Sequence, residues 1–324
     1  MTDQEDESTQ NPFEELEALQ ERLEELDSLV SGETPVAASP QSPGNSSRQQ
    51  GISNPLQEQL LGAIERDELR LYWQPQYDRN GELVGAEALL RWLHPEQGLL
   101  PARDFLPEAT KSDLINDLDT WVLEKACRFQ QRLSSEMPET DGMTIAVNIN
   151  SRHFREERFS SRVASILETT QANPARLTLE LSEGMMSGEL TTIAAGMCEL
   201  KKLGVRFAVD DFGTGCTSIP VLKLLPLDQV KIDHTLVHEL VNDHNSAVIV
   251  EAMVALATKL GLSVVAEGVE SAKEREFLHK KNCRLFQGWL FCKPLPEEKF
   301  LAMLLEHGQE TQKSKGMQSA FEGF

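Results

Sequence analysis

The chain has 324 residues, of which 40% are hydrophobic, so it can bury one large core or two smaller ones. It carries 52 Asp and Glu against 31 Lys and Arg, a formal net charge of −21. This balance excludes the basic surface that nucleic acid or an anionic membrane attracts, and the lack of any run of about 18 apolar residues excludes a membrane-inserted helix.

The cysteines and the N-terminus favour a reducing cytoplasm. The five cysteines are odd in number and none forms a CxxC pair, which disfavours a disulfide framework and a zinc site. The opening residues, MTDQEDESTQ, are acidic and polar, unlike a signal peptide. We therefore expect a cytoplasmic protein.

Residues 1–31 are predicted to be an acidic tail with a short amphipathic helix. Apolar residues at alternating spacings of three and four form a seam in it, namely Leu16, Leu19, Leu23, Leu26 and Val30. Two interpretations stay open: a helix that binds a protein partner or a second copy, and a solvated helix on a disordered tail. Residues 32–55 are predicted to be a flexible linker, and residues 308–324 a polar C-terminal tail.

Strand and helix patterns alternate between residues 56 and 307. The strands are expected at 69–77, 83–92, 143–150, 176–183, 205–211, 228–233, 262–269 and 284–289. The helices are expected at 118–133, 156–170, 188–203, 245–260 and 270–281. This order predicts an α/β protein with a modified TIM (β/α)8 barrel. Asn80-Gly81 between the first two strands is a hairpin signal, so one strand of the barrel should be antiparallel.

Polar residues collect where seven of these strands end. They are Glu87, Asn148, Glu180, Asp210 with Asp211, Lys231, Glu267 and Gln287. In a barrel such ends converge on one face, and the carboxylates would repel one another unless cations neutralise them. Their oxygens are hard ligands that suit Mg²⁺ or Mn²⁺.

Two adjacent carboxylates occur in FAVDDFGTG, residues 207–215. Successive side chains of a strand point to opposite faces, so Asp210 and Asp211 can both point inward only if the chain bends there. One aspartate for each of two neighbouring metal ions would explain the pair, an arrangement typical of phosphoester hydrolysis.

The same residues carry a family resemblance. EALLRWLHP resembles the signature of the EAL-domain cyclic-di-GMP phosphodiesterases, and VNIN, LELSE, DDFGTG, VKID, AEGVE and QGWLFCKPLP follow in order. The likeness covers residues 56–305. It implies a barrel with one antiparallel strand, an EAL-domain homodimer, and hydrolysis of cyclic-di-GMP to linear pGpG with Mg²⁺ or Mn²⁺, two ions per site.

The resemblance also implies roles for single residues. The implied metal ligands are Glu87, Asn148, Glu180, Asp210 and Asp211. Lys231 would contact the attacking water, and Glu267 would act as general base or support the metal ligands. The implied substrate contacts are Gln74, Arg91 and Gln287, and the implied supports of the loop and the site network are Glu183 and Glu270.

Several of these residues have simpler interpretations. Glu87 could pair with Arg91, and Asn148 could be an ordinary hydrogen-bonded strand end. A lone lysine such as Lys231 usually reaches the surface, and Glu270 could cap the following helix. His153, His234, His238 and His244 are expected at surface or loop positions, without chemistry.

The sequence departs from the family pattern at three places. Cys216 and Thr217 stand in the loop after the aspartates, where an aromatic residue and serine are usual. Thr110 and Ser112–Asp113 replace a glutamate and Thr-Gly, and we expect this change to alter dimer or regulatory surfaces. Trp73 replaces a common tyrosine, and we expect it to affect guanine stacking. Two functions stay open: an active phosphodiesterase, and a non-catalytic cyclic-di-GMP receptor or protein-interaction module on the same scaffold.

Overall fold

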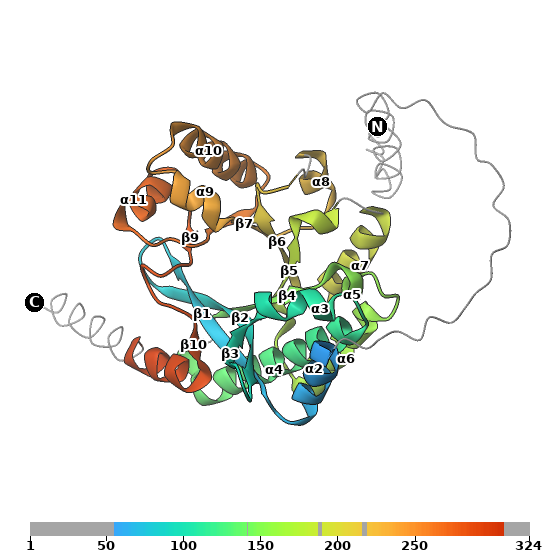
Figure 1. Cartoon of the computed structure of the whole chain (residues 1–324). Helices are drawn as coiled ribbons and strands as arrows, with labels where there is room; N and C mark the ends of the chain where they lie inside the picture. Colours follow the sequence, from blue (N-terminus) through green and yellow to red (C-terminus); the bar gives the residue numbers. More distant parts are fainter. Residues whose placement is uncertain (1–54, 141, 187–189, 216–218, 308–324) are drawn as a thin grey trace, which may run out of the picture.

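The computed structural model describes residues 55–140, 142–186, 190–215 and 219–307 (Figure 1). The predicted acidic tail over 1–31, the predicted linker up to residue 54, the C-terminal tail over 308–324 and the departures at Cys216 and Thr217 lie outside these ranges. Pro55 is the first residue of helix α2 (Pro55–Glu65), where proline's fixed φ suits a helix start.

Eight strands close into a barrel through the pairing of β1 with β2. They are β1 (Leu69–Asp78), β2 (Leu83–His94), β4 (Thr144–Ile149), β5 (Leu177–Ser182), β6 (Arg206–Phe212), β7 (Gln229–Ile232), β8 (Ser263–Ala266) and β9 (Leu285–Phe286). Strand β1 is antiparallel to both of its barrel neighbours, β2 and β9, whereas the other neighbouring pairs are parallel. The predicted modified (β/α)8 barrel with one antiparallel strand is confirmed.

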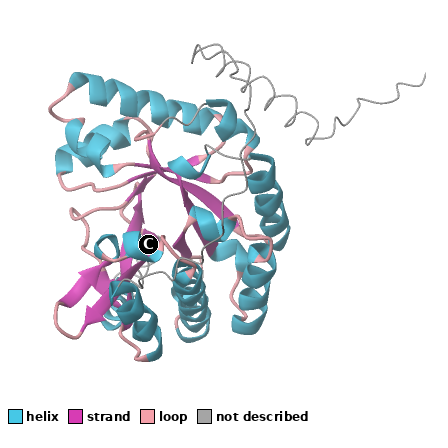
Figure 2. Ribbon diagram, turned by 45° about the vertical axis from the view of Figure 1, so that its right-hand side comes forward, coloured by secondary structure: helices cyan, strands magenta, loops and turns pink. Residues whose placement is uncertain are grey.

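Helices cover the outside of the barrel, as Figures 1 and 2 show. They are α3 (Leu106–Ala109), α4 (Leu114–Glu136), α5 (Ser151–Phe154), α6 (Phe159–Thr170), α7 (Leu190–Leu203), α8 (Ile219–Leu224), α9 (His234–Glu239), α10 (His244–Lys259) and α11 (Ala272–Lys280), followed by helical residues 297–307. Strands β3 (Gly98–Pro101) and β10 (Leu295–Pro296) extend the sheet beside β2 and β1. Among the described helices, none combines the length and apolar character that crossing a membrane requires.

The β1–β2 hairpin turns at the predicted Asn80-Gly81. Gly81 has a φ of 87°, a left-handed conformation that glycine adopts without steric cost. The Asp78 carboxylate accepts hydrogen bonds from the backbone N–H groups of Asn80 (2.8 Å) and Glu82 (2.9 Å), which closes the turn. The hairpin sets β1 against the direction of the other strands and places Gln74 opposite Glu87.

The core between the strands and the helices explains one wrong expectation. Trp73 is fully buried, and its ring stacks on Phe129 of α4 at 3.9 Å and lies 6.2 Å from Phe300. Since neighbouring side chains of a strand point to opposite faces, Trp73 packs against the helices while Gln74 faces the barrel interior. The expectation that Trp73 affects guanine stacking is therefore wrong.

Candidate functional site

A bulge in β6 brings the two adjacent aspartates together. The register between β6 and β7 shifts between Val209 and Phe212, and Asp211 has a φ of 55°, which is uncommon outside glycine. One carboxylate oxygen from each of Asp210, Asp211 and Glu267 lies within 4.8 Å of the others. The bulge thus turns both aspartates toward one point at the carboxyl ends of the parallel strands.

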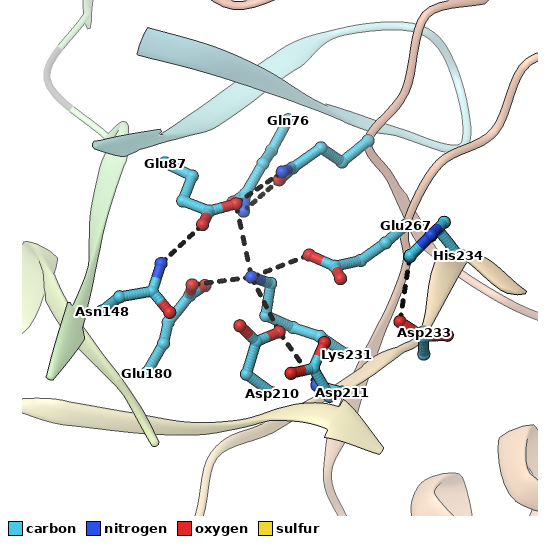
Figure 3. A network of polar contacts seen from close by, with 11 residues as sticks. Gln76, Glu87, Asn148, Glu180, Asp210, Asp211, Lys231, Asp233, His234 and Glu267 are labelled. Atoms are coloured by element: carbon cyan, nitrogen blue, oxygen red, sulfur yellow. Dashed lines mark hydrogen bonds and ion pairs between the residues drawn. The ribbon is translucent and has the colours of Figure 1, made fainter. Parts of the chain in front are cut away.

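Lys231 lies at the centre of the site, as Figure 3 shows. The side chain is fully buried, and its Nζ atom lies 2.6 Å from Glu180 Oε2 and 2.7 Å from Glu267 Oε1. It is also 3.1 Å from Asp210 Oδ1 and 3.3 Å from Glu87 Oε2. The simpler interpretation, in which this lysine reaches the surface, is wrong. We call Glu87, Glu180, Asp210, Asp211 and Glu267 the acidic cluster.

Amide side chains fix the orientation of Glu87. Asn148 Nδ2 donates to Glu87 Oε1 at 2.7 Å, and Gln287 Nε2 donates to Glu87 Oε2 at 2.5 Å. Gln76 Nε2 in turn donates to Gln287 Oε1 at 2.9 Å. Gln76 was not among the residues predicted from the sequence, although it lies two residues after Gln74 and therefore faces the same side of β1. The carboxylate of Glu87 is held by these amides and Lys231.

The acidic cluster carries more negative charge than Lys231 can neutralise. Burial, followed by repulsion from Glu87, raises the pKa of Glu180 well above its ordinary value. Burial also raises the pKa of Glu267 to about 8, with Asp210 adding to the effect and Lys231 opposing it. For Glu87 burial acts in the same direction, but Lys231 and the amide hydrogen bonds outweigh it and lower the pKa.

The cluster fits a divalent cation that prefers oxygen ligands. Oε1 of Glu180 is buried and has no hydrogen-bond partner among the residues that the structure describes, although it is a strong acceptor. The converging carboxylates, together with the amide of Asn148, offer hard oxygen donors of the kind that Mg²⁺ and Mn²⁺ prefer. A cation here would take up the unused oxygen and offset the repulsion within the cluster.

Glu183 holds the loop that follows Asp211. Its Oε2 atom accepts hydrogen bonds from the backbone N–H groups of Gly213 (2.9 Å) and Gly215 (3.0 Å). A Cβ atom at Gly215 would lie 3.0 Å from the Glu183 carboxyl carbon, so this close approach favours glycine. A buried carboxylate from the start of η4 (Glu183–Met186) therefore links two strand-end loops of the site.

Arg91 and Gln74 lie on the same inner face of the hairpin as Glu87. The Arg91 guanidinium is partly buried, donates to the Leu90 carbonyl at 2.8 Å and lies 5.7 Å from the centre of the Tyr72 ring. Gln74 Nε2 donates to the Cys292 carbonyl at 2.6 Å. Arg91 does not pair with Glu87 as the simpler interpretation had it, because Glu87 is bound by Lys231 and the amides.

Comparisons with known proteins agree with this geometry. The family model described as "EAL domain" matches residues 57–294, most of the chain. The chain belongs to the EAL domain family.

Two curated relatives come from Pseudomonas aeruginosa. The chain is 40% identical over 244 residues to the bifunctional diguanylate cyclase/cyclic di-GMP phosphodiesterase MucR. This match covers 75% of the chain and 35% of MucR. It is 36% identical over 242 residues to the cyclic di-GMP phosphodiesterase NbdA, covering 74% of this chain and 31% of NbdA. The chain thus spans about a third of the length of these relatives.

A solved structure of the PaMucR phosphodiesterase in complex with c-di-GMP is similar to this EAL domain. The TM-score is 0.73 and the sequence identity is 37%, and the match covers 76% of this chain and 99% of that chain.

Glu270 lies apart from the acidic cluster of this EAL domain. Its carboxylate is 3.8 Å from His238 Nε2, and its side chain is 44% exposed. It does not cap α11, because Ser271 is the N-cap residue and Glu274 completes the capping box. The cap interpretation is therefore wrong.

Two further residues near the site differ from expectation. Asp233, which follows β7, was missed, and it accepts from the Thr235 backbone N–H at 2.9 Å. His153 was expected at the surface, but it is fully buried and its Nδ1 lies 3.2 Å from Asp119 Oδ2. Asp119 also accepts from the backbone N–H of Asn150 at 2.9 Å, so this pair supports the strand end that carries Asn148.

Thr110 and Ser112–Asp113, which depart from the family pattern, lie in the segment between α3 and α4. Thr110 Oγ1 donates to the Pro107 carbonyl at 2.9 Å, and Asp113 Oδ1 pairs with Arg152 of α5 at 2.9 Å. These contacts are exposed, and they involve no residue of the acidic cluster.

Proposed function

We propose that this EAL domain is a metal-dependent phosphodiesterase that hydrolyses cyclic-di-GMP to linear pGpG. The observation that carries the proposal is the acidic cluster around one buried lysine, with Asn148 and Gln287 hydrogen-bonded to Glu87. The names of MucR and NbdA and the c-di-GMP bound to PaMucR support the choice of substrate.

The charge of the cluster favours two divalent cations. Five carboxylates and one ammonium carry a net charge of −4 when all are ionised, which two divalent ions balance. We infer that Glu87, Asn148, Glu180 and Asp210 hold one Mg²⁺ or Mn²⁺ ion and that Asp211 holds the second. When bound, the ions neutralise charge on the phosphoryl group and make water more acidic.

Lys231 and Glu267 would act on the attacking water. The ammonium of Lys231 lies among the carboxylates, where it can orient a water molecule and stabilise negative charge that develops on the phosphoryl oxygens. Glu267, 2.7 Å from Lys231 Nζ, would accept the proton of the water at its carboxylate. The water oxygen bonds to phosphorus, the bond to the ribose 3′ oxygen breaks, and that oxygen takes up a proton. The product is linear pGpG with a 5′ phosphate.

The inner face of the hairpin would bind the dinucleotide. Arg91 supplies a planar cation that matches phosphate oxygens, and Tyr72 next to it offers an aromatic surface. Gln74 and Gln287 would contribute through amide groups that they now use for Cys292 and Glu87. Substrate binding would therefore exchange some of these internal hydrogen bonds.

The test compares hydrolysis by three variants in Mg²⁺ or Mn²⁺. Glu87→Gln and Lys231→Met should lower the rate at least about 100-fold, since each removes charge that acts directly on the reaction. Glu82→Gln is the matched control, because this exposed glutamate lies in the same hairpin. Hydrolysis that persists in both cluster variants, or that needs no divalent ion, would contradict the proposal.

The assembly of the chain is a separate proposal. A homodimer through the EAL domain, and a protein partner for the acidic segment over 1–31, stay predictions from the sequence and the resemblance. Sedimentation of the full chain and of a chain lacking residues 1–50 tests the homodimer and whether residues 1–50 contribute to it. A dimer that survives the deletion points to the EAL domain, and a monomer in both cases contradicts the homodimer.

A further inference from the structure

A cavity of about 450 Å³ lies beside helix α4, on the outer side of the barrel (Figure 1). Leu69 and Leu71 of β1 line it, on the same face of the strand as Trp73, whose ring stacks on α4. We call this cavity the α4 groove, and the side chains of α4 that line it are Trp121, Lys125, Arg128, Phe129 and Arg132. The acidic cluster faces the barrel interior, so the α4 groove is separate from the site of the proposed function.

The α4 groove concentrates positive charge on a chain whose formal net charge is −21. Four cations line it, because Arg70 of β1 joins the three from α4. The two carboxylates of the lining, Asp67 and Glu297, each pair with an arginine, at 3.5 and 2.6 Å. Among the described residues, neither Lys125 nor Arg128 forms an ion pair, although both side chains are exposed. Two cations of the groove are thus available to an acidic partner.

Helix α4 arranges its part of the lining in one stripe. Trp121, Lys125, Arg128 and Arg132 are spaced by four, three and four residues, so they share one face of the helix. Lys125 Nζ lies 5.4 Å from the centre of the Trp121 ring, and the Arg132 guanidinium lies 5.5 Å from the centre of the Phe129 ring. At 1.5 Å per residue the stripe is about 16 Å long. Its length and its aromatic rings suit an elongated acidic segment that carries an aromatic side chain.

The chain has a segment of this chemistry at residues 11–31. It contains seven acidic residues and one arginine, and Phe13 stands directly before two glutamates. Phe13 is also the one aromatic residue in the sequence of residues 1–54. Aromatic rings pack well against one another, and Trp121 and Phe129 offer such contacts in the groove. We propose that residues 11–31 dock in the α4 groove of their own chain, with Phe13 in the cavity and the glutamates on the cations of α4.

The predicted linker is long enough for this docking. Helix α2 has 11 residues and is therefore about 16 Å long, and the groove begins at Asp67, just after this helix. A flexible chain of the length of residues 32–54 has a typical end-to-end distance of about 24–29 Å, which exceeds that span. A tether of this kind gives an effective concentration in the millimolar range. Several exposed ion pairs, each weak alone, therefore suffice to hold the segment.

Carbodiimide coupling of the full chain tests the contact directly. The reagent joins a carboxylate to a lysine amine when the two groups touch, and Lys125 is the lysine of the groove lining. We expect an amide between Lys125 and a glutamate of residues 11–31, identified by mass spectrometry. The reaction uses a mixture of unlabelled and ¹⁵N-labelled chains, so that an amide within one chain is distinguished from one between two chains.

Trypsin cleavage after Arg22 measures how much of the segment is docked. Cleavage follows the undocked population when docking exchanges rapidly, so a segment docked for about 90% of the time is cut about 10-fold more slowly than the free peptide 11–31. We expect slowing of this order in the full chain at low salt. It should be lost in 1 M salt, where the Debye length is about 3 Å.

Variants separate docking from other causes of slow cleavage. Lys125→Glu combined with Arg128→Glu should restore the cleavage rate of the free peptide. Phe13→Ala, which changes no residue of the barrel, should raise the rate several-fold, whereas Lys125→Arg should keep cleavage slow but give no amide. Lys259→Glu is the control, because this exposed lysine belongs to α10, which packs on β7 and β8, and it should leave cleavage slow.

Three results would overturn the proposal. They are cleavage of the full chain at the rate of the free peptide, slow cleavage that persists in the charge-reversed double variant, and amides that join labelled to unlabelled chains. The last result would assign the α4 groove to a second copy of the chain. Since none of these measurements involves hydrolysis, their outcome is independent of the proposed function.

Discussion

Glu180→Gln should stabilise the metal-free protein while it removes metal binding. Glu180 is buried, its Oε1 has no hydrogen-bond partner within the described part of the chain, and its neighbours Glu87 and Asp210 are also acidic. An ionised carboxylate in this position is unfavourable unless cations are bound. Glutamine has nearly the same shape, keeps an oxygen for Lys231 and turns an amide N–H₂ toward the neighbouring carboxylates.

The size and pH dependence of this effect follow from the raised pKa of Glu180. The raised pKa disfavours the ionised carboxylate of the folded wild type at pH 8, so the variant should be more stable there by at least on the order of 1 kcal/mol, which is the worth of about one pKa unit. A carboxyl group with a raised folded pKa stabilises the fold below its unfolded pKa and loses that contribution as pH rises. The advantage of Glu180→Gln should therefore grow from pH 5 to pH 8.

Urea unfolding at both pH values, with EDTA and then with Mg²⁺, measures the effect. At an Mg²⁺ concentration of 100 times the Kd the wild type should gain about 2.7 kcal/mol and the variant much less, so the difference between the two proteins narrows or reverses. Asp228→Asn is unsuitable as a control, because the Asp228 carboxylate accepts a hydrogen bond from the backbone N–H of Phe207 in β6. The control is therefore Glu82→Gln, which changes an exposed glutamate. A metal-free Glu180→Gln that is less stable than the wild type at pH 8 would refute the reasoning.

Three further predictions test other parts of the site. Lys231→Met should destabilise the metal-free protein by about 3 kcal/mol in urea unfolding, because four carboxylates lose their cation; a change below about 1 kcal/mol would contradict the central place of this ammonium. Since burial raises the pKa of Glu267 to about 8, Mg²⁺ must displace a proton at lower pH. Calorimetry in two buffers should therefore show tighter Mg²⁺ binding at pH 8.5 than at pH 6.5, with proton release that decreases as pH rises. An Mg²⁺ affinity that does not change with pH would contradict the raised pKa of Glu267. Trp73→Ala should cost about 3–5 kcal/mol of stability while the affinity of the folded protein for cyclic-di-GMP changes little, and a large loss of affinity would restore the stacking role for Trp73.

Sequence patterns predicted the barrel because each strand has a strong local signal. Asn80-Gly81 predicted the antiparallel strand from turn chemistry alone, and the polar strand ends predicted which side chains meet. The bulge at Asp210 and Asp211 was also foreseeable, since two adjacent carboxylates with following glycines require a bend. The early end of strand β9 could not be foreseen from the sequence, because the segment from Gly288 leaves the sheet to pass against the Val269 backbone.

Side-chain partners were less predictable than strand positions. Trp73 was assigned to the wrong face because the family position suggested a ligand contact, although alternation with Gln74 already placed it outward. Glu270 and His238, and Asp119 and His153, are brought together by packing between elements distant in the sequence. No local periodicity reports such contacts, so the structure was needed to find them.

The most direct test of the central claim is incubation of the full chain with cyclic-di-GMP and Mg²⁺ or Mn²⁺ in H₂¹⁸O, with the products resolved by chromatography and mass spectrometry. Glu87→Ala serves as the inactive comparison. We predict linear pGpG that carries one ¹⁸O in its 5′ phosphate, formed by the wild type alone. Tight binding of intact cyclic-di-GMP without any product would contradict the enzyme and make this EAL domain a receptor.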